Sequence, residues 1–378
     1  MQAPLKTNWL LVFVLLLAGL FAAAQFGKLT LTLRELRMLY PQGGAFVPVL
    51  ISIVGMVGVV LGSVAGAVVT RVGVARALTG SLLAGGVLSL IEATLPSMSV
   101  FAALRVLEGL AHLSIVVATP TLLASIATDA DRPVVMGIWA AFFGISMAIL
   151  AMILPGLLTL GGLSAVFIFN GVGMLIIAAL LYPLLPKARG QAMPISFIRE
   201  HKVIYTTPRL IIAGSGFVWY TASYIALLAV LPIALKLPVW VITALPLISI
   251  VGTILGGFLA KRIAPDRLAN IGFALTALSA GLVWALAPAI WPLFILFFVM
   301  APIPAGFFAA IPYFNETLTD RARATGGIAQ MGNVGTTLGT PIFVLSLDAG
   351  GLTAVCIVLV VFCLAGMSCT LFLRRQIK

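Results

Sequence analysis

The residues of this sequence that could do chemistry lie together in one otherwise apolar segment, residues 98–124. The segment carries Arg105, Glu108 and His112, and at about 100° per residue in an α-helix these three side chains and Gly109 share one face. An arginine offers a fixed cationic fork for a carboxylate or another oxyanion. A buried glutamate and a histidine can exchange a proton near neutral pH. The pattern therefore predicts a site where an anion and a proton meet.

Two interpretations of this polar stripe stay open. In the functional one, Arg105 binds a substrate anion; an anion that displaces Glu108 from Arg105 favours protonation of Glu108, and His112 shares the proton. This would give proton-coupled anion uptake. In the structural one, Arg105 and Glu108 are i,i+3 neighbours that neutralise each other, and His112 is a hydrogen-bonded core residue.

Two further charged residues lie near the ends of apolar segments. Lys28 either lines the same cavity as Arg105 and adds positive potential, or snorkels toward the membrane surface. Glu92 is expected to be solvated, because it falls close to the end of its segment.

The second half of the chain offers aromatic and amide groups instead of central charges. Phe217, Tyr220 and Tyr224 share one helical face, and Gln330 and Asn333 are spaced i,i+3. The tyrosines are candidates for an aromatic wall that packs on a substrate and donates hydrogen bonds to it. The two amides are candidates for substrate binding. Ordinary packing of the rings and cross-linking of helices by the amides are the alternatives.

The composition indicates what kind of elements must position these groups. Of the 378 residues, 62% are hydrophobic and only 8% are charged, whereas a soluble domain is near half apolar and a quarter charged. A soluble enzyme and a disordered chain are therefore excluded. The basic residues are scattered rather than clustered, which excludes a nucleic-acid-binding protein despite a net charge of +12. No phosphate-loop, metal-binding or haem motif occurs, so neither a cofactor nor an enzymatic activity is expected.

Apolar runs of about 20 residues are long enough to cross a bilayer, and they predict an all-α polytopic membrane protein with twelve transmembrane helices. The expected helix cores are 9–33, 44–69, 74–95, 98–124, 134–158, 164–185, 210–235, 239–260, 268–288, 291–313, 323–347 and 350–373. Most of the 22 lysines and arginines fall on the side of both termini, and the other side holds only Arg34, Arg37 and Lys236. This bias predicts that both termini are cytoplasmic, and the simplest location is a bacterial inner membrane.

The two halves of the chain resemble each other at an offset of about half the chain length. The matching motifs are Gly66-x-x-x-Thr70-Arg71-x-Gly73-x-x-Arg76 with Gly257-x-x-x-Lys261-Arg262, and Asp131-Arg132 before Gly137 with Asp320-Arg321 before Gly326. Parallel repeats of this kind are one of the two known transporter designs. The repeat predicts an N-terminal six-helix bundle over residues 1–185, a cytoplasmic linker over 186–208 and a C-terminal six-helix bundle over 209–378.

The chain resembles the major facilitator superfamily of secondary transporters over essentially its whole length. The segment from Gly66 to Arg76 is similar to the loop signature of that family, although the Asp of the signature is Thr70 here. Arg105-x-x-Glu108-Gly109 resembles the family motif of an Arg followed by Gln and Gly, with Glu108 at the usual Gln position. The resemblance implies two pseudo-symmetric bundles and a gating loop. The candidate residues of that loop are Gly66, Arg71, Gly73, Arg76 and Arg262.

The residues and the resemblance together predict a secondary active transporter that moves a small organic solute, an anion in the first instance, by alternating access with protons. The Gly-Pro pattern of drug/proton antiporters is not evident, and cyanate-permease-like organic-anion transporters are the suggested branch. The predicted partners are the solute, protons and membrane lipids; no nucleic acid is expected, and the chain is predicted to be a monomer. The alternative is a proton-linked efflux pump for amphipathic drugs or metabolites. A third is a non-transporting membrane protein on the same fold.

Overall fold

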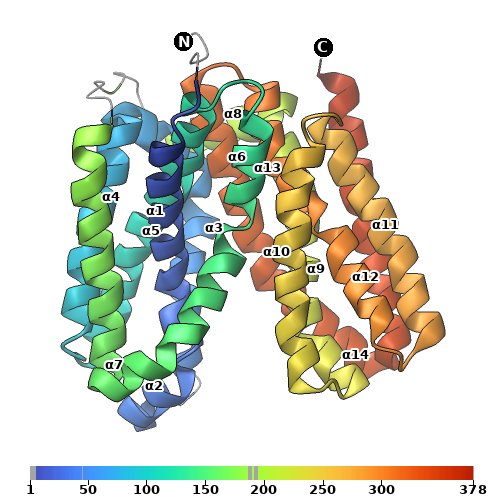
Figure 1. The fold of residues 1–378 in the computed structure, drawn as a ribbon, viewed down its shortest axis with the longest axis horizontal. Coiled ribbons are helices and arrows are strands. Elements are labelled where there is room, and N and C mark those ends of the chain that lie inside the picture. Colours follow the sequence, from blue (N-terminus) through green and yellow to red (C-terminus); the bar gives the residue numbers. More distant parts are fainter. Residues whose placement is uncertain (1–5, 45, 186–189, 191–194, 378) are drawn as a thin grey trace.

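The computed structural model describes residues 6–44, 46–185, 190 and 195–377, and the regular structure in these ranges is helical (Figure 1). The helices are α1 (Trp9–Thr30), α2 (Leu33–Leu39), the 3-10 helix η1 (Pro41–Gly43), α3 (Phe46–Val72), α4 (Val74–Glu92), α5 (Met98–Ile126), α6 (Arg132–Ala140), α7 (Phe142–Leu184), α8 (Phe197–Thr206), α9 (Pro208–Leu235), α10 (Val239–Leu259), α11 (Pro265–Leu286), α12 (Trp291–Met300), α13 (Pro302–Phe314) and α14 (Leu318–Gln376).

Ten of the described segments are long and apolar enough to cross a membrane. Two of them contain a non-helical break, α7 at Gly161 and Gly162 and α14 at Gly350 and Gly351. Each of these two segments therefore crosses twice, which gives the twelve crossings that the sequence predicts. One of the ten segments is made jointly by α12 and α13, which meet at Ala301.

The two breaks are copies of one turn. Gly162 and Gly351 both have a φ of +61°, with ψ of −149° and −150°, a region that residues with a side chain rarely occupy. The two glycines are 189 positions apart, half of the 378 residues. The turn thus supports the repeat that the loop motifs indicate, and the paired glycines are a signal in the sequence that could have located both hairpins.

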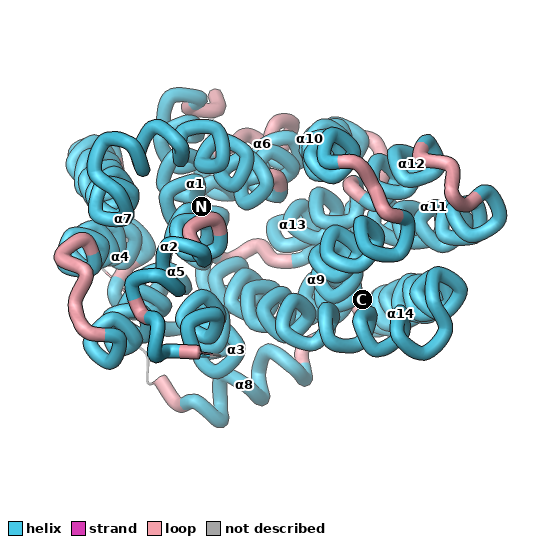
Figure 2. Tube along the Cα trace, turned by 90° about the horizontal axis from the view of Figure 1, so that it is seen from below, coloured by secondary structure: helices cyan, strands magenta, loops and turns pink. Residues whose placement is uncertain are grey.

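Figure 1 shows α1–α7 on one side of the molecule and α9–α14 on the other. We call these groups the first and second halves, and we call the end where α1 begins and α14 ends the terminal end. The halves meet where α3 packs on α14 and where α6 packs on α10 and α13. Helix α8 lies against α3 and α9 (Figure 2). The bundle boundaries at 185 and 209 stay a prediction, and residues 186–189 and 191–194 of the predicted linker lie outside the described residues.

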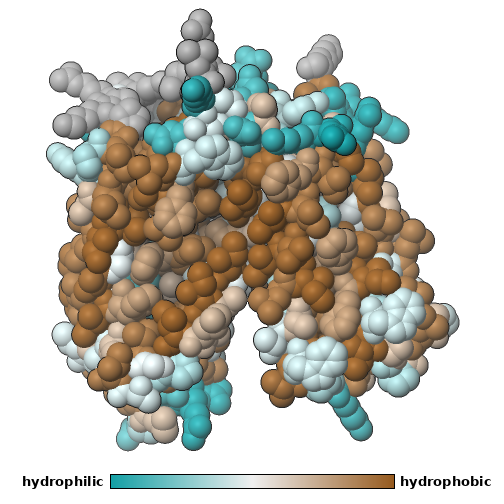
Figure 3. Space-filling model, viewed as in Figure 1, coloured by the Kyte–Doolittle hydropathy of each residue, from teal (hydrophilic) through white to brown (hydrophobic). Residues whose placement is uncertain are grey.

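The surface is divided as a membrane protein requires. On the face seen in Figure 3, apolar side chains cover the middle, hydrophilic ones gather at the terminal end, and a hollow between the halves opens at the opposite end. Lipid offers no hydrogen bonds, so a helical surface exposed to it must be apolar. The halves are in contact at the terminal end and apart at the other.

Gly162→Ala should destabilise the protein by about 1–3 kcal/mol, because alanine would have to adopt a backbone conformation that suits only glycine. Crowding does not contribute, since a Cβ added at Gly162 would meet no atom within 4 Å. Gly156→Ala is the matched control: it also has free space, but it lies in regular helix, where alanine is preferred. Thermal unfolding in detergent should show a lower Tm for Gly162→Ala alone. Equal Tm values would contradict the strain argument.

Candidate functional site

Four charged side chains meet inside the first half, toward the end away from the chain termini. Lys28 comes from the last turn of α1, Glu92 from the end of α4, and Arg105 and Glu108 from α5. All four are fully buried. Lys28 Nζ donates to Glu92 Oε2 and to Glu108 Oε1 at 2.6 Å each, and to Ser89 Oγ at 2.9 Å. We call these four side chains the charge cluster; it is neutral when all four are ionised.

Arg105 is bonded on three sides. Its Nη1 donates to Glu108 Oε2, its Nε to the Leu50 carbonyl at 3.2 Å and its Nη2 to the Gln25 carbonyl at 3.0 Å. The i,i+3 ion pair of the structural interpretation is therefore present, and the guanidinium also ties α5 to α1 and α3. Arg105 is fully buried and bonded to all three partners, so a substrate-binding role for Arg105 stays a prediction.

Lys28 and Glu92 are placed differently from what the sequence suggests. The ammonium of Lys28 is enclosed by two carboxylates and lies 5.0 Å from the centre of the Phe167 ring, so it neither snorkels nor faces open space. The expectation that Glu92 is solvated is wrong, because α5 and α7 pack against α4 and bury its last residue. Lys28 and Glu92 are single charges of opposite sign in two apolar segments. Because such charges pair with one another inside a membrane, the sequence could have predicted this ion pair.

His112 lies one turn beyond Glu108, outside the charge cluster. Its Nδ1 is 3.0 Å from the Ala22 carbonyl oxygen and 3.3 Å from Gln25 Oε1. Its ring meets the half-buried ring of Phe26 edge-on, with centroids 5.0 Å apart. The polar residues of α5 thus have separate partners. Glu108 contacts Lys28 and Arg105, whereas His112 is close to Ala22 and Gln25. A proton relay between the two stays a prediction.

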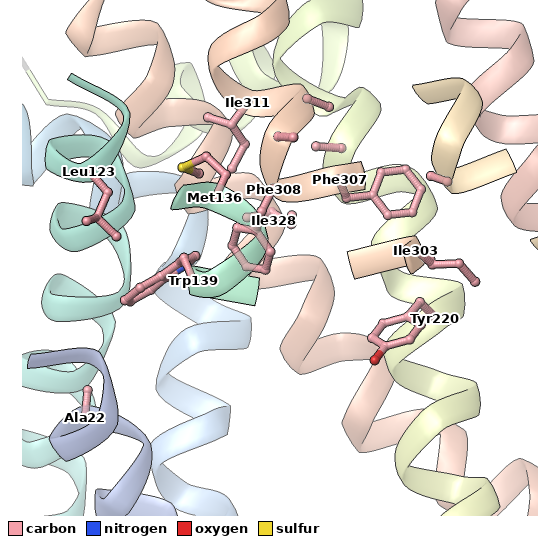
Figure 4. Packing of buried hydrophobic residues seen from close by; sticks show 14 of the residues in the cluster. Ala22, Leu123, Met136, Trp139, Tyr220, Ile303, Phe307, Phe308, Ile311 and Ile328 are labelled. Carbon is pink, nitrogen blue, oxygen red and sulfur yellow. The ribbon is translucent and has the colours of Figure 1, made fainter. Parts of the chain in front are cut away.

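The aromatic residues of α9 form a stacked column. Ring centroids are 5.7 Å apart for Phe217 and Tyr220 and 5.5 Å apart for Tyr220 and Tyr224. Phe217 packs edge-on against Phe307 and Phe308 of α13, and Figure 4 shows these two rings together with Tyr220. Phe217 is therefore a packing residue, and Tyr224 is the tyrosine of the column that keeps more exposed surface.

Gln330 and Asn333 lie where the two halves meet. Gln330 Nε2 donates to the Val59 carbonyl of α3 at 2.6 Å, and its Oε1 accepts from the Tyr205 hydroxyl of α8 at 2.9 Å. Asn333 lies against Gly58 of α3, where a Cβ would collide with its amide. The structure thus places both amides in helix contacts, away from the charge cluster, and their binding of a substrate stays a prediction.

Of the five gating-loop candidates, Gly66 is the one that lies directly against the other half. A Cβ at Gly66 would collide with the backbone of α14. Gly73 has a φ of +99° at the turn between α3 and α4, which a glycine adopts without strain. Arg71, Arg76 and Arg262 are exposed near the terminal end. The five candidates therefore have different surroundings: Gly66 contacts the other half, Gly73 forms a turn, and the three arginines lie on the surface.

An ion pair joins the halves at the terminal end. Lys261, after α10, has its Nζ 3.6 Å from Asp131 Oδ1, just before α6, and the Thr7 hydroxyl donates to Asp131 Oδ2 at 2.8 Å. Mainly through that hydrogen bond, the pKa of Asp131 lies below its usual value, so the carboxylate stays ionised into the acidic range. Thr70, at the Asp position of the loop signature, donates to the Gly66 carbonyl of its own helix. The cross-half ion pair is therefore made by Lys261, which matches Thr70 in the repeat, and Thr70 itself bonds within its own helix.

Two further contacts close the terminal end. Gly137 of α6 faces Gly257 of α10, and neither has room for a Cβ. Trp139 of α6 is fully buried; it stacks on Phe142 and meets the edge of Phe308 of α13, with centroids 6.5 Å apart (Figure 4). Both contacts therefore join α6 of the first half to helices of the second half.

Comparison with known proteins gives a match at the level of a family. The sequence profile of the Major Facilitator Superfamily matches residues 11–239, more than half of the chain. No curated protein matches the chain in sequence.

Several solved structures share the fold at low identity. FucP, the fucose:proton symporter of E. coli, described in the outward conformation, is 15% identical with a TM-score of 0.72, over 97% of this chain and 98% of its own. The human organic anion transporter MFSD10 is 14% identical with a TM-score of 0.72, over 96% and 98%. The proton:xylose symporter XylE, bound to 6-bromo-6-deoxy-D-glucose, is 15% identical with a TM-score of 0.72, over 97% and 95%. Such likeness establishes the fold.

Lys28→Met should destabilise the protein by about 3–5 kcal/mol, because two buried carboxylates would then share one cation. Lys28→Met/Glu92→Gln removes one charge of each sign and should recover most of that loss. Thermal unfolding in detergent measures both variants. If Lys28→Met is as stable as the unmodified protein, the two buried carboxylates do not depend on Lys28 for their charge balance, and the prediction is wrong.

Gly137→Leu should open the terminal end, because the new side chain would meet the backbone of Gly257. Spin labels at Arg76 and Arg267, both exposed, should report longer distances by double electron–electron resonance in a background without native cysteines. Gly80→Leu is the control, since a Cβ there meets no atom within 4 Å, and it should leave the distances unchanged. Identical distance distributions in both variants would show that the glycine contact does not hold this end closed.

Proposed function

This chain belongs to the Major Facilitator Superfamily, and we propose that it is a secondary transporter that carries a small organic anion across the membrane together with protons. The observation that carries the proposal is the charge cluster, in which two carboxylates share the ammonium of Lys28 and Arg105 completes the balance. Ionisable groups within membrane spans are costly and mark ion and proton pathways. Apolar side chains at these positions would pack the same helices with equal or greater stability than buried ion pairs. The presence of the charged residues therefore favours a role in transport in addition to packing.

In this proposal the first half supplies the charge chemistry. Arg105 and Lys28 provide the positive charge that attracts the substrate anion, and Glu108 and His112 are the proton-coupling groups. An anion that approaches Arg105 competes with Glu108 for it, and a carboxylate that loses its cation gains affinity for a proton. Anion binding and proton binding are then favourable together, which is the requirement for symport.

The second half supplies the remaining contacts. Tyr220 and Tyr224 form an aromatic wall, with Tyr224 the member that has exposed surface to offer a substrate. Because Gln330 and Asn333 lie in contacts with α3, we assign them first to closure of the terminal end, and to substrate binding only when that end opens.

We further propose that both termini are in the cytoplasm, in a bacterial inner membrane, since most basic residues lie toward the terminal end. The hollow then faces outward, as FucP is described, and transport requires the terminal end to open as the other closes. We propose that a monomer does this, with bundles 1–185 and 209–378 joined by linker 186–208 and with the Gly66 loop as a gate.

Structures of the same fold provide precedents for each part of the proposal. FucP and XylE are proton symporters, and MFSD10 is an organic anion transporter. A shared fold does not transfer a substrate, so the anion is argued from Arg105 and Lys28. Proton-linked efflux of amphipathic compounds is the alternative, which the stacked column of Phe217, Tyr220 and Tyr224 favours.

A thermal-shift screen of the purified protein against mono- and dicarboxylates, sulfonates and cationic amphiphiles tests the proposal. A binding anion at 100 times its Kd should stabilise the protein by about 2.7 kcal/mol. Arg105→Gln/Glu108→Gln, which leaves the charge cluster balanced, should lose this shift. The same anion should enter proteoliposomes under an inward proton gradient. Stabilisation by cationic amphiphiles alone would favour efflux and contradict anion uptake.

A further inference from the structure

The charge cluster treats its two glutamates differently. Both carboxylate oxygens of Glu108 have cation donors, Oε2 from Arg105 and Oε1 from Lys28. Glu92 has one such donor, Lys28 at Oε2. Among the described residues its Oε1 has no hydrogen-bond partner; Arg105 Nη1 is 3.7 Å away, within reach of charge but not of a hydrogen bond. A fully buried carboxylate oxygen thus has an open position for a proton.

We propose that Glu92 is the proton-binding group of this transporter and that Glu108 is its fixed counter-ion. The inference rests on the proposed anion–proton symport and deepens it, and it assigns to Glu92 the proton-coupling role that the sequence suggests for Glu108 and His112. Both carboxylates touch the same Lys28 nitrogen at 2.6 Å, so their bound oxygens lie no further apart than twice that distance. Like charges so close in a dry site favour protonation of one member, and the less well bonded one takes the proton.

The same arrangement specifies the charge of the substrate. With Glu92 ionised, the charge cluster has no net charge. A proton that binds to Glu92 Oε1 forms an O–H bond and breaks none, and it leaves the charge cluster at +1. A net charge in a low-dielectric interior is costly, and one monovalent anion near Lys28 and Arg105 removes it. The substrate class is therefore a small monoanion, taken up with one proton in an electroneutral step.

A route for the proton leads from the end away from the termini. A cavity of about 350 Å³ at that end is lined by Arg37, Tyr40 and Val47, among others. Burial, and next the negative charge of Glu92, raise the pKa of the Tyr40 phenol. The Tyr40 ring packs on Phe101, with centroids 6.0 Å apart. In this proposal the proton enters from this cavity, whose wall residue Tyr40 packs on α5, the helix that carries Arg105 and Glu108.

The groups that face Glu92 come from each element around it. Lys28 approaches from α1, Arg105 and Glu108 from α5, and Tyr40 from the segment after α2. The part of α7 that packs here, around Phe167, carries no titratable side chain. The proton affinity of Glu92 therefore depends on two cations, one anion and one phenol.

Infrared difference spectroscopy of the protein in lipid nanodiscs, between mildly alkaline and mildly acidic pH, tests the assignment without a substrate. The carbonyl band of a protonated carboxylic acid should appear on acidification and disappear in Glu92→Gln. In Glu108→Gln the band should remain but appear at a lower pH, because the like charge that favours protonation of Glu92 is lost. A band that persists in Glu92→Gln, or that is absent from the unmodified protein, would overturn the proposal. If Glu92→Gln fails to fold, the charge-balanced Lys28→Met/Glu92→Gln takes its place, with Arg105→Gln/Glu108→Gln as its matched control, which should keep the band.

Transport separates this inference from the proposed function. The probe is the anion that gives the largest thermal shift, and the readout is its uptake into proteoliposomes with and without a proton gradient. The Glu92→Gln protein should still exchange internal for external anion, but should lose gradient-driven accumulation. Accumulation that survives in Glu92→Gln refutes the role of Glu92 and leaves anion transport intact. A titrating Glu92 in a protein that moves no anion refutes the proposed function alone.

Discussion

The first half of this protein is organised by the rule that a charge inside a bilayer must be balanced. An isolated Arg, Lys or Asp at mid-membrane costs about 2.5–3.5 kcal/mol on insertion scales. Lys28, Glu92, Arg105 and Glu108 avoid that cost only when α1, α4 and α5 stand in one arrangement. Arg105 adds the Leu50 carbonyl and so brings α3 into it. The bonds that position these helices are therefore made by the same charged groups that the proposed transport uses.

The contact between the halves follows a different principle, since a transporter has to break it in every cycle. Close approach of Gly137 to Gly257 gives shape complementarity without large side chains. The ion pair of Lys261 with Asp131 is partly exposed, and such pairs contribute at most about 1 kcal/mol. The first half thus has a dry ion network inside it, whereas the ion pair that joins it to the second half is partly exposed.

The sequence predicts the fold well because membrane constraints act on composition. Apolar length determines the crossings, and the offset between loop motifs indicates the repeat. Within α5, helical periodicity also identifies the pairing of Arg105 with Glu108. It could not identify Glu92 as their neighbour, because periodicity relates residues of one helix only and the burial of Glu92 depends on how α5 and α7 pack against α4. Gln330 illustrates the same limit, since its partner is a backbone carbonyl of α3.

The repeat explains why one half has charges and the other has rings. At an offset of 189 residues, the offset of the two glycine turns, Lys28 corresponds to Phe217, Arg105 to Phe294 and Glu108 to Phe297. Phe217 stacks in the α9 column, and Phe297 packs against Tyr224 of that column. Three of the four positions of the charge cluster are thus matched by aromatic side chains in the second half, whereas Glu92 corresponds to Gly281. Charged and aromatic side chains are both long enough to fill the space between these helices. A carboxylate can also bind a proton, which a phenylalanine cannot. The two halves therefore share a fold and differ in the chemistry of their interiors.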